Sequence, residues 1–162
     1  MNFLDRLLAH DHWTTRQLLE LSEPLRDAQL DQEFDVGLRT LRATLDHVIW
    51  NMEAWTDAMR GRPLRDRGPR DVPAMLARLD GAASDLAELA TDVDRRGAWD
   101  EQWLDTFDDP PRSRTFGGTI AHVITHSMHH RAQVLFMLRR LGVEAPEGDV
   151  LSWEQALDDH GR

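Results

Sequence analysis

The stretch from Thr125 to Arg131 reads Thr-His-Ser-Met-His-His-Arg and lies within a run of helical periodicity over residues 116–141. Two of its histidines, His126 and His130, stand four positions apart. Residues at that spacing lie on one face of an α-helix, about one turn from each other. Two imidazoles held in this way can reach a single metal ion. The stretch therefore predicts a long helix that carries part of a metal site.

The neighbouring positions on this helix are less suited to binding the same ion. His122 stands four residues before His126 but lies farther round the helix, so we expect it to pack or form hydrogen bonds at the edge of the site. His129 should face away. A peptidase of the His-Glu-x-x-His kind carries its general base directly after the first ligand, where this chain has Ser127. The pattern favours a metal site with no base of its own beside it.

Helical periodicity recurs in most of the chain. Three further long segments and one short one repeat apolar residues at a helical period. They cover residues 3–21, 38–59, 73–93 and 152–158. No segment shows the alternation that is typical of strands, and 162 residues can bury one full core but hardly two. We therefore predict an all-α four-helix bundle in a single domain over residues 1–162, with a short C-terminal helical tail.

One histidine on the second long segment belongs with the pair. His47 lies beside the apolar stripe of residues 38–59, and alone it would indicate only a packed boundary residue. It occupies an edge of its helix, as His126 and His130 do on theirs. Bundles build metal sites from inward side chains on facing helices. The shared geometry predicts that His47, His126 and His130 meet.

Several polar residues near these histidines are candidate helpers in catalysis. They are Asp46, Asn51, Glu53 and Arg131. The helical period places Glu53 well away from His47. For Arg131 and Gln133 we favour hydrogen bonding on the helix surface or between helices.

Two residues of the first helical segment allow more than one interpretation. Asp11 falls inside the apolar arc, where a carboxylate needs a partner. We favour a structural contact over support of a metal-bound imidazole. Trp13 lies on the opposite side of that helix, where it is either partly exposed, or covered by a later loop, or part of a dimer interface.

Two connections between the long segments also carry notable residues. Residues 60–70 are rich in Gly and Pro and contain five arginines, which indicates a solvated linker or, less simply, a segment that attracts an anionic substrate. Residues 94–115 form a long connection that we expect to cover one end of the bundle. Trp99 and Trp103 either seal the core there or form a platform for a substrate, and we favour the seal.

Composition excludes several classes of function. The formal net charge is -10, which argues against binding to nucleic acid or to anionic membranes, because both require basic surface. The chain has no cysteine, and all 19 of its basic residues are arginine. A protein thiol and a lysine Schiff base are therefore excluded. No signal-peptide pattern and no run of about 18 apolar residues is present, so we expect a cytoplasmic protein.

The helix with the histidine pair resembles a known family motif. Residues 122–133 read His-Val-Ile-Thr-His-Ser-Met-His-His-Arg-Ala-Gln and resemble the His-Val-x-x-His-x-x-x-His-Arg-x-Gln pattern of the DinB-like family (DinB/YfiT-like four-helix bundles). Leu45-Asp46-His47 with Glu53 and Trp55 is a second match. Around Trp13 the match is weaker, because Asp11 and Thr15 replace the asparagines that many members carry.

The resemblance implies a fold, a metal site and a class of reaction. It implies a bundle whose helix order differs from simple up-down-up-down, a divalent metal held by His47, His126 and His130, and often a homodimer. It also implies relatives that transfer groups to or from low-molecular-weight thiols. Imidazole ligands suit Zn, Ni or Fe, and three of them leave a coordination position open, as catalytic sites do.

The chemistry that follows requires a cosubstrate. Because the chain has no cysteine, any thiol must be a small molecule that binds beside an electrophile. The leading hypothesis is a metal-dependent thiol S-transferase-like or hydrolase-like enzyme that acts on a small molecule. The competing hypothesis is a non-catalytic, dimeric stress-response bundle that keeps a metal or only the fold.

Overall fold

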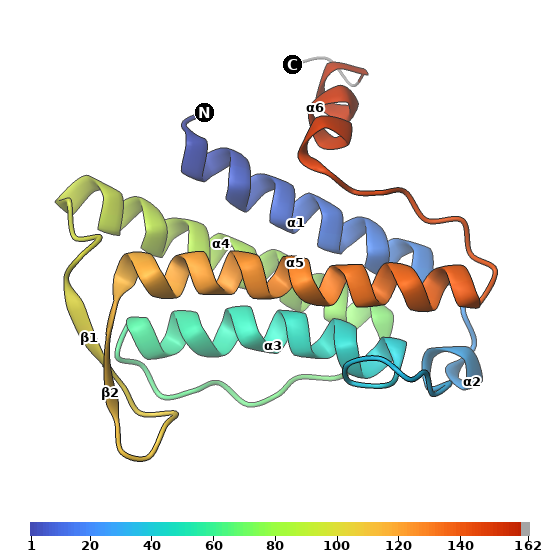
Figure 1. Ribbon diagram of the computed structural model, residues 1–162, viewed down its shortest axis with the longest axis horizontal. Helices are drawn as coiled ribbons and strands as arrows, with labels where there is room; N and C mark the ends of the chain where they lie inside the picture. Colours follow the sequence, from blue (N-terminus) through green and yellow to red (C-terminus); the bar gives the residue numbers. More distant parts are fainter. Residues whose placement is uncertain (160–162) are drawn as a thin grey trace.

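Four long helices form the body of the computed structural model, which describes residues 1–159 (Figure 1). They are α1 (Phe3–Ser22), α3 (Leu41–Met59), α4 (Val72–Arg96) and α5 (Phe116–Arg140). A short helix, α2 (Asp27–Leu30), follows α1, and α6 (Val150–Asp159) is the C-terminal tail. The predicted four-helix bundle with a helical tail is confirmed.

Helix order around the bundle is not the order of the chain. α3 packs against α4 and α5, and α1 packs against the same two helices from the other side. α1 and α3 are therefore diagonal to each other although they are consecutive long helices. This arrangement leaves α5 between α1 and α3, so that its two sides contact different partners.

Local sequence explains where these helices begin. A side chain accepts a backbone N–H in the first turn of each long helix, which satisfies a donor that has no partner inside the helix. The four capping residues are Asn2, Thr40, Asp71 and Thr115. α3 begins at Leu41 rather than at Leu38, because Arg39 has a positive φ of 71° and Thr40 is extended.

The core lies where the four apolar faces meet. α4 contributes the largest number of buried apolar side chains, and α3 and α5 come next. Its fully buried side chains include Leu45, Ile49, Met52, Leu79, Leu86, Ile120 and Leu138. None of the described helices is long and apolar enough to cross a membrane.

The connection between α4 and α5 contains a two-stranded sheet that the sequence did not predict. Strands β1 (Gln102–Asp105) and β2 (Arg112–Thr115) pair antiparallel, with Gln102 opposite Thr115. Each strand has four residues, which is too short to show an alternating pattern. The hairpin lies beside the end of the bundle where α5 begins (Figure 1).

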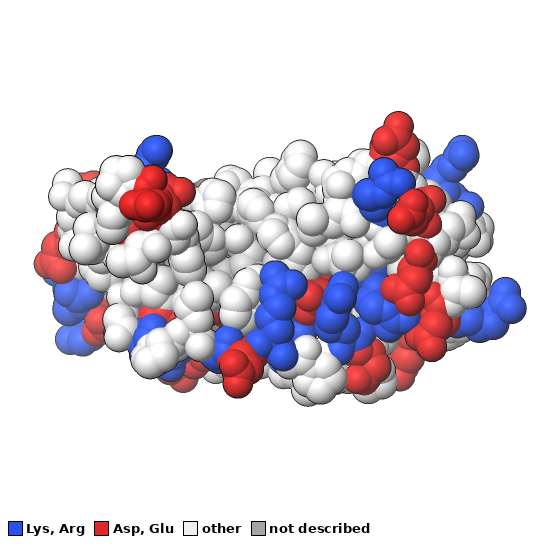
Figure 2. Space-filling view, turned by 90° about the horizontal axis from the view of Figure 1, so that it is seen from below, with Lys and Arg blue, Asp and Glu red and all other residues white. Residues whose placement is uncertain are grey.

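The arginine-rich linker is bound to the bundle rather than solvated along its whole length. Arg65 pairs with Asp57 of α3 and Asp85 of α4, and Arg67 and Arg70 both pair with Asp46 of α3. The linker runs alongside α3 (Figure 1), and Figure 2 shows basic and acidic side chains interspersed on the side of the molecule seen from below. These arginines stabilise the packing of the linker on the helices.

Candidate metal centre

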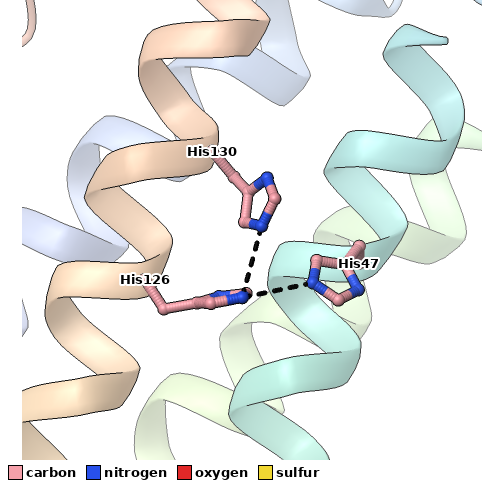
Figure 3. Close-up of side chains that lie close together, drawn as sticks. All are labelled: His47, His126 and His130. Carbon is pink, nitrogen blue, oxygen red and sulfur yellow. Dashed lines mark hydrogen bonds between the residues drawn. The ribbon is translucent and has the colours of Figure 1, made fainter. Parts of the chain in front are cut away.

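Three imidazoles meet between α3 and α5. His47 comes from α3 and His126 and His130 come from successive turns of α5, with their rings directed toward one another (Figure 3). The Nε2 atom of His126 lies 3.3 Å from Nε2 of His47 and 3.2 Å from Nε2 of His130. One nitrogen from each of the three lies within 4.8 Å of the others. These side chains could hold a metal ion.

The donor set fits a divalent transition metal. Zinc–imidazole bonds of about 2.0–2.1 Å in a tetrahedral site place neighbouring nitrogens about 3.3 Å apart, close to the two separations seen here. Neutral imidazole also suits nickel and iron. Among the described residues no carboxylate or other histidine joins the three as a fourth ligand. A bound ion would therefore keep at least one position for an exogenous molecule.

Burial keeps the three rings in the protonation state that binds metal. Burial and the neighbouring imidazoles, His130 first among them, together lower the pKa of His126 to about 4. Burial also lowers the pKa of His47 and of His130, although the hydrogen bond that His130 forms with Gln133 opposes the shift at His130. All three rings are therefore neutral at pH 7, with lone pairs available to a cation.

Gln133 supports one of these rings from behind. Its Oε1 lies 2.9 Å from Nδ1 of His130, and as an amide oxygen it accepts the ring N–H. This assigns the proton to Nδ1 and leaves the Nε2 lone pair directed toward the other two histidines. Its amide nitrogen lies 3.0 Å from Nε2 of His129, which is exposed. From sequence we expected Gln133 only to bond between helices or on the surface, and its three-residue spacing from His130 was the available signal.

The other candidate helpers contact different partners. Asp46 and Glu53 both pair with Arg78 of α4, so their carboxylates face the α3–α4 interface. Asn51 is partly buried, and its Oδ1 has no hydrogen-bond partner among the described residues. Asp46 and Glu53 are therefore engaged by Arg78 rather than by the three histidines.

A buried ion pair lies on the far side of α5. Arg131 pairs with Asp11 of α1 and donates a hydrogen bond of 2.9 Å to Ser127. All three residues are buried. Asp11 therefore has a structural role, as we favoured. The hydroxyl oxygen of Ser127 accepts its hydrogen bond from Arg131. Trp13 is partly buried.

A cavity of about 360 Å³ is bounded by His122, whose ring separates it from His126. It is lined by Trp55 of α3, by Gly118, Thr119 and His122 of α5, and by residues 113–115 of β2. The ring of His122 is centred 5.2 Å from His126 and 5.5 Å from Trp55, so it packs at the edge of the site. Trp99 and Trp103 do not line the cavity. Trp103 instead donates to Thr119 and packs on Trp55.

Fold and site together define a helical bundle with a three-histidine candidate metal centre between two of its helices. The chain belongs to the DinB family, whose model matches residues 1–159. The resemblance seen in the helix with the histidine pair is thus confirmed over nearly the whole chain. No curated protein matches the chain.

Proposed function

We propose that this protein is a divalent-metal-dependent enzyme that transfers a small thiol to an electrophilic small molecule, or hydrolyses that molecule. The observation that carries the proposal is the convergence of three neutral imidazoles, with a cavity of about 360 Å³ on the other side of the His122 ring from His126. A divalent ion held by His47, His126 and His130 would act as a Lewis acid and lower the pKa of a thiol or water that it binds.

In this proposal the protein's own side chains hold the metal and orient its ligands, and they do not transfer protons. Gln133 fixes the tautomer of His130, and Ser127, which occupies the place of a peptidase's general base, is buried against Arg131. The chain offers no thiol, so the nucleophile must enter as a cosubstrate or as water. This favours thiol transfer, because a thiol with a lowered pKa needs no separate base. We also propose a homodimer, on the basis of the resemblance and of Trp13. A cytoplasmic location remains our expectation from the sequence.

A second function is favoured by the same lack of a base. The protein would then be a non-catalytic, dimeric stress-response bundle that binds a metal. In that case the cavity would not bind a reactant, and Gln133 would serve only to hold the metal.

Bound metal measured in untagged protein tests the premise of both proposals. We expect wild type to carry close to one equivalent of metal, and His126→Ala to lose it. His12→Ala is the matched control, since His12 pairs with Asp80 on the other side of the bundle. Equal and negligible metal in wild type and His126→Ala would remove the basis for a metalloenzyme.

Activity assays then separate the two functions. With loaded wild type, an electrophile is tested at neutral pH with each small thiol and with water alone, and loss of the electrophile and of the thiol is followed. Turnover that His126→Ala abolishes supports the enzyme. A loaded protein that consumes the electrophile neither with any thiol nor with water alone is the result expected of the binding protein.

A further inference from the structure

The cavity beside the histidines has a rigid aromatic wall. The ring of Trp55 meets three others edge-on: Trp103 at 6.0 Å and 80°, Phe107 at 4.8 Å and 84°, and His122 at 5.5 Å and 77°. Rings packed on several sides cannot turn freely, so the indole forms a fixed aromatic surface beside the cavity, with the guanidinium carbon of Arg114 6.0 Å from its ring centre. Such a surface favours a planar ligand over a puckered one of equal size.

Hydroxyl groups supply the polar part of the lining, and most of their bonding capacity is used. Thr119 donates to the carbonyl oxygen of Thr115 and accepts from Trp103, while the Thr115 hydroxyl accepts from the backbone N–H of Gly118. Ser113 donates to Gln102. What remains for a ligand is neutral hydrogen bonding, through the Thr115 O–H and the lone pairs of Ser113.

The charges on this wall cancel. Arg114 is the one charged residue that lines the cavity, and it pairs with Asp105, which is buried, and with Asp108. Arg112 also pairs with Asp108. Two guanidinium groups thus face two carboxylates. The pairing raises the pKa of Arg114 and lowers that of Asp105, so both stay ionised at neutral pH. An anionic ligand would enter without a free positive charge to meet it.

We propose that this cavity binds the electrophile and that it selects an uncharged, planar, conjugated molecule. The identification of the ligand as the electrophile rests on the proposed function, whereas the preference for flat and uncharged ligands rests on the cavity alone. A ligand on Trp55 would lie one side chain, that of His122, away from His126. The ligand would thus be held near His126, across the ring of His122, by contacts that need neither metal nor thiol.

Three small probes of similar size test the two preferences separately. Benzamide is planar and uncharged, benzoate is planar and anionic, and cyclohexanecarboxamide is uncharged and puckered. Each is titrated into the full-length, ¹⁵N-labelled protein as purified, without thiol, and the shifts at Trp55 and His122 give the dissociation constants. We expect benzamide to bind at least about threefold more tightly than cyclohexanecarboxamide and about tenfold more tightly than benzoate.

Two exposed positions on the hairpin locate the binding. Ser113→Phe places a ring in the cavity mouth and should raise the dissociation constant of benzamide at least about tenfold. Leu104→Phe is the matched control, since Leu104 lies opposite Ser113 in the sheet but does not line the cavity. It should bind benzamide as wild type does.

Each contrary result overturns a defined part of the inference. Equal binding of benzoate removes the selection against charge, and equal binding of cyclohexanecarboxamide removes the selection for flat ligands. No saturable shift with benzamide, or the same affinity in Ser113→Phe, removes the cavity as the binding site. Because no thiol or turnover enters the measurement, failure of the proposed reaction would leave these outcomes unchanged.

Discussion

The backbone of Gly37 lies against the side-chain amide of Gln133. A Cβ added to Gly37 would come within 2.6 Å of the amide carbon of Gln133, and closer still to its Oε1, the atom that accepts the N–H of His130. Gly37 also has a positive φ of 48°. Gly37, in the loop before α3, thus leaves room for the side chain of Gln133, which orients the ring of His130 on α5.

The first prediction is that Gly37→Ala weakens metal binding. The obstructing atoms are the end of a flexible side chain, so the added methyl group should push Gln133 away from His130. Loss of such a supporting hydrogen bond typically lowers metal affinity by about 10–100-fold. Chelator competition measures the affinity, and ¹⁵N shifts of the His130 ring in metal-free protein report its tautomer.

Gly61→Ala is the control for that variant. Gly61 also has a positive φ, of 64°, but nothing lies within 4 Å of an added Cβ. It should suffer similar backbone strain and keep wild-type metal affinity. Equal affinities in the two variants would show that Gly37 does not act through Gln133.

A second prediction concerns the chemistry of Gln133 itself. Gln133→Glu keeps an oxygen that can accept the His130 N–H, whereas Gln133→Leu has a similar size and no acceptor. We expect Gln133→Glu to retain metal affinity to within a few-fold, and Gln133→Leu to lose about 10–100-fold. The same chelator competition decides it, and equal losses in both variants would count against the hydrogen bond.

A third prediction concerns the ion pair between Asp11 and Arg131. Asp11→Ala leaves a buried guanidinium without its carboxylate and should lower the free energy of unfolding by about 3–5 kcal/mol. Replacing both residues, as Asp11→Leu with Arg131→Met, should cost less, because no buried charge remains. Urea unfolding measures both variants.

An exposed pair supplies the comparison. Glu33→Ala removes the partner of Arg39 at the surface and should leave the free energy of unfolding close to that of wild type, because an exposed ion pair contributes little. If Asp11→Ala were as mild as Glu33→Ala, the buried pair would not be what joins α1 to α5.

The fourth prediction is a pH dependence of stability away from the histidines. Arg65 donates side-chain and backbone hydrogen bonds to Asp57, and this pairing lowers the pKa of Asp57 to about 2. The unfolded value is about 3.9. Because the folded pKa is the lower one, the pair stabilises the fold above about pH 4, and this contribution is lost as the pH falls toward 2.

Asp57→Asn should therefore be less stable than wild type by about 2 kcal/mol at pH 7, and the difference should shrink toward about pH 2. Urea unfolding at several pH values checks this, with Asp100→Asn as an exposed control. A difference that stayed constant from pH 7 to 2 would contradict the role of the carboxylate charge.

The long helices and the histidine pair were predictable from local pattern. α5 repeats its apolar residues over seven turns, and His126 and His130 follow from a spacing within it. The strands β1 and β2 were not predictable, since each is four residues long and pairs through the backbone. The meeting of His47 with the pair depended on which helices are neighbours. The role of Gln133 had only its three-residue spacing from His130 as a signal in the sequence, and it is visible once its Oε1 is placed against Nδ1 of that ring.

His130 and Arg131 are consecutive, yet one faces α3 and the other faces α1. Rotating α5 to move its histidines relative to His47 would pull Arg131 away from Asp11 and leave both charges buried and unpaired. The ion pair between Arg131 and Asp11 therefore restrains the rotation of α5 and, with it, the positions of His126 and His130. The spacing of the three nitrogens is set when the chain folds, and an incoming ion has to suit it.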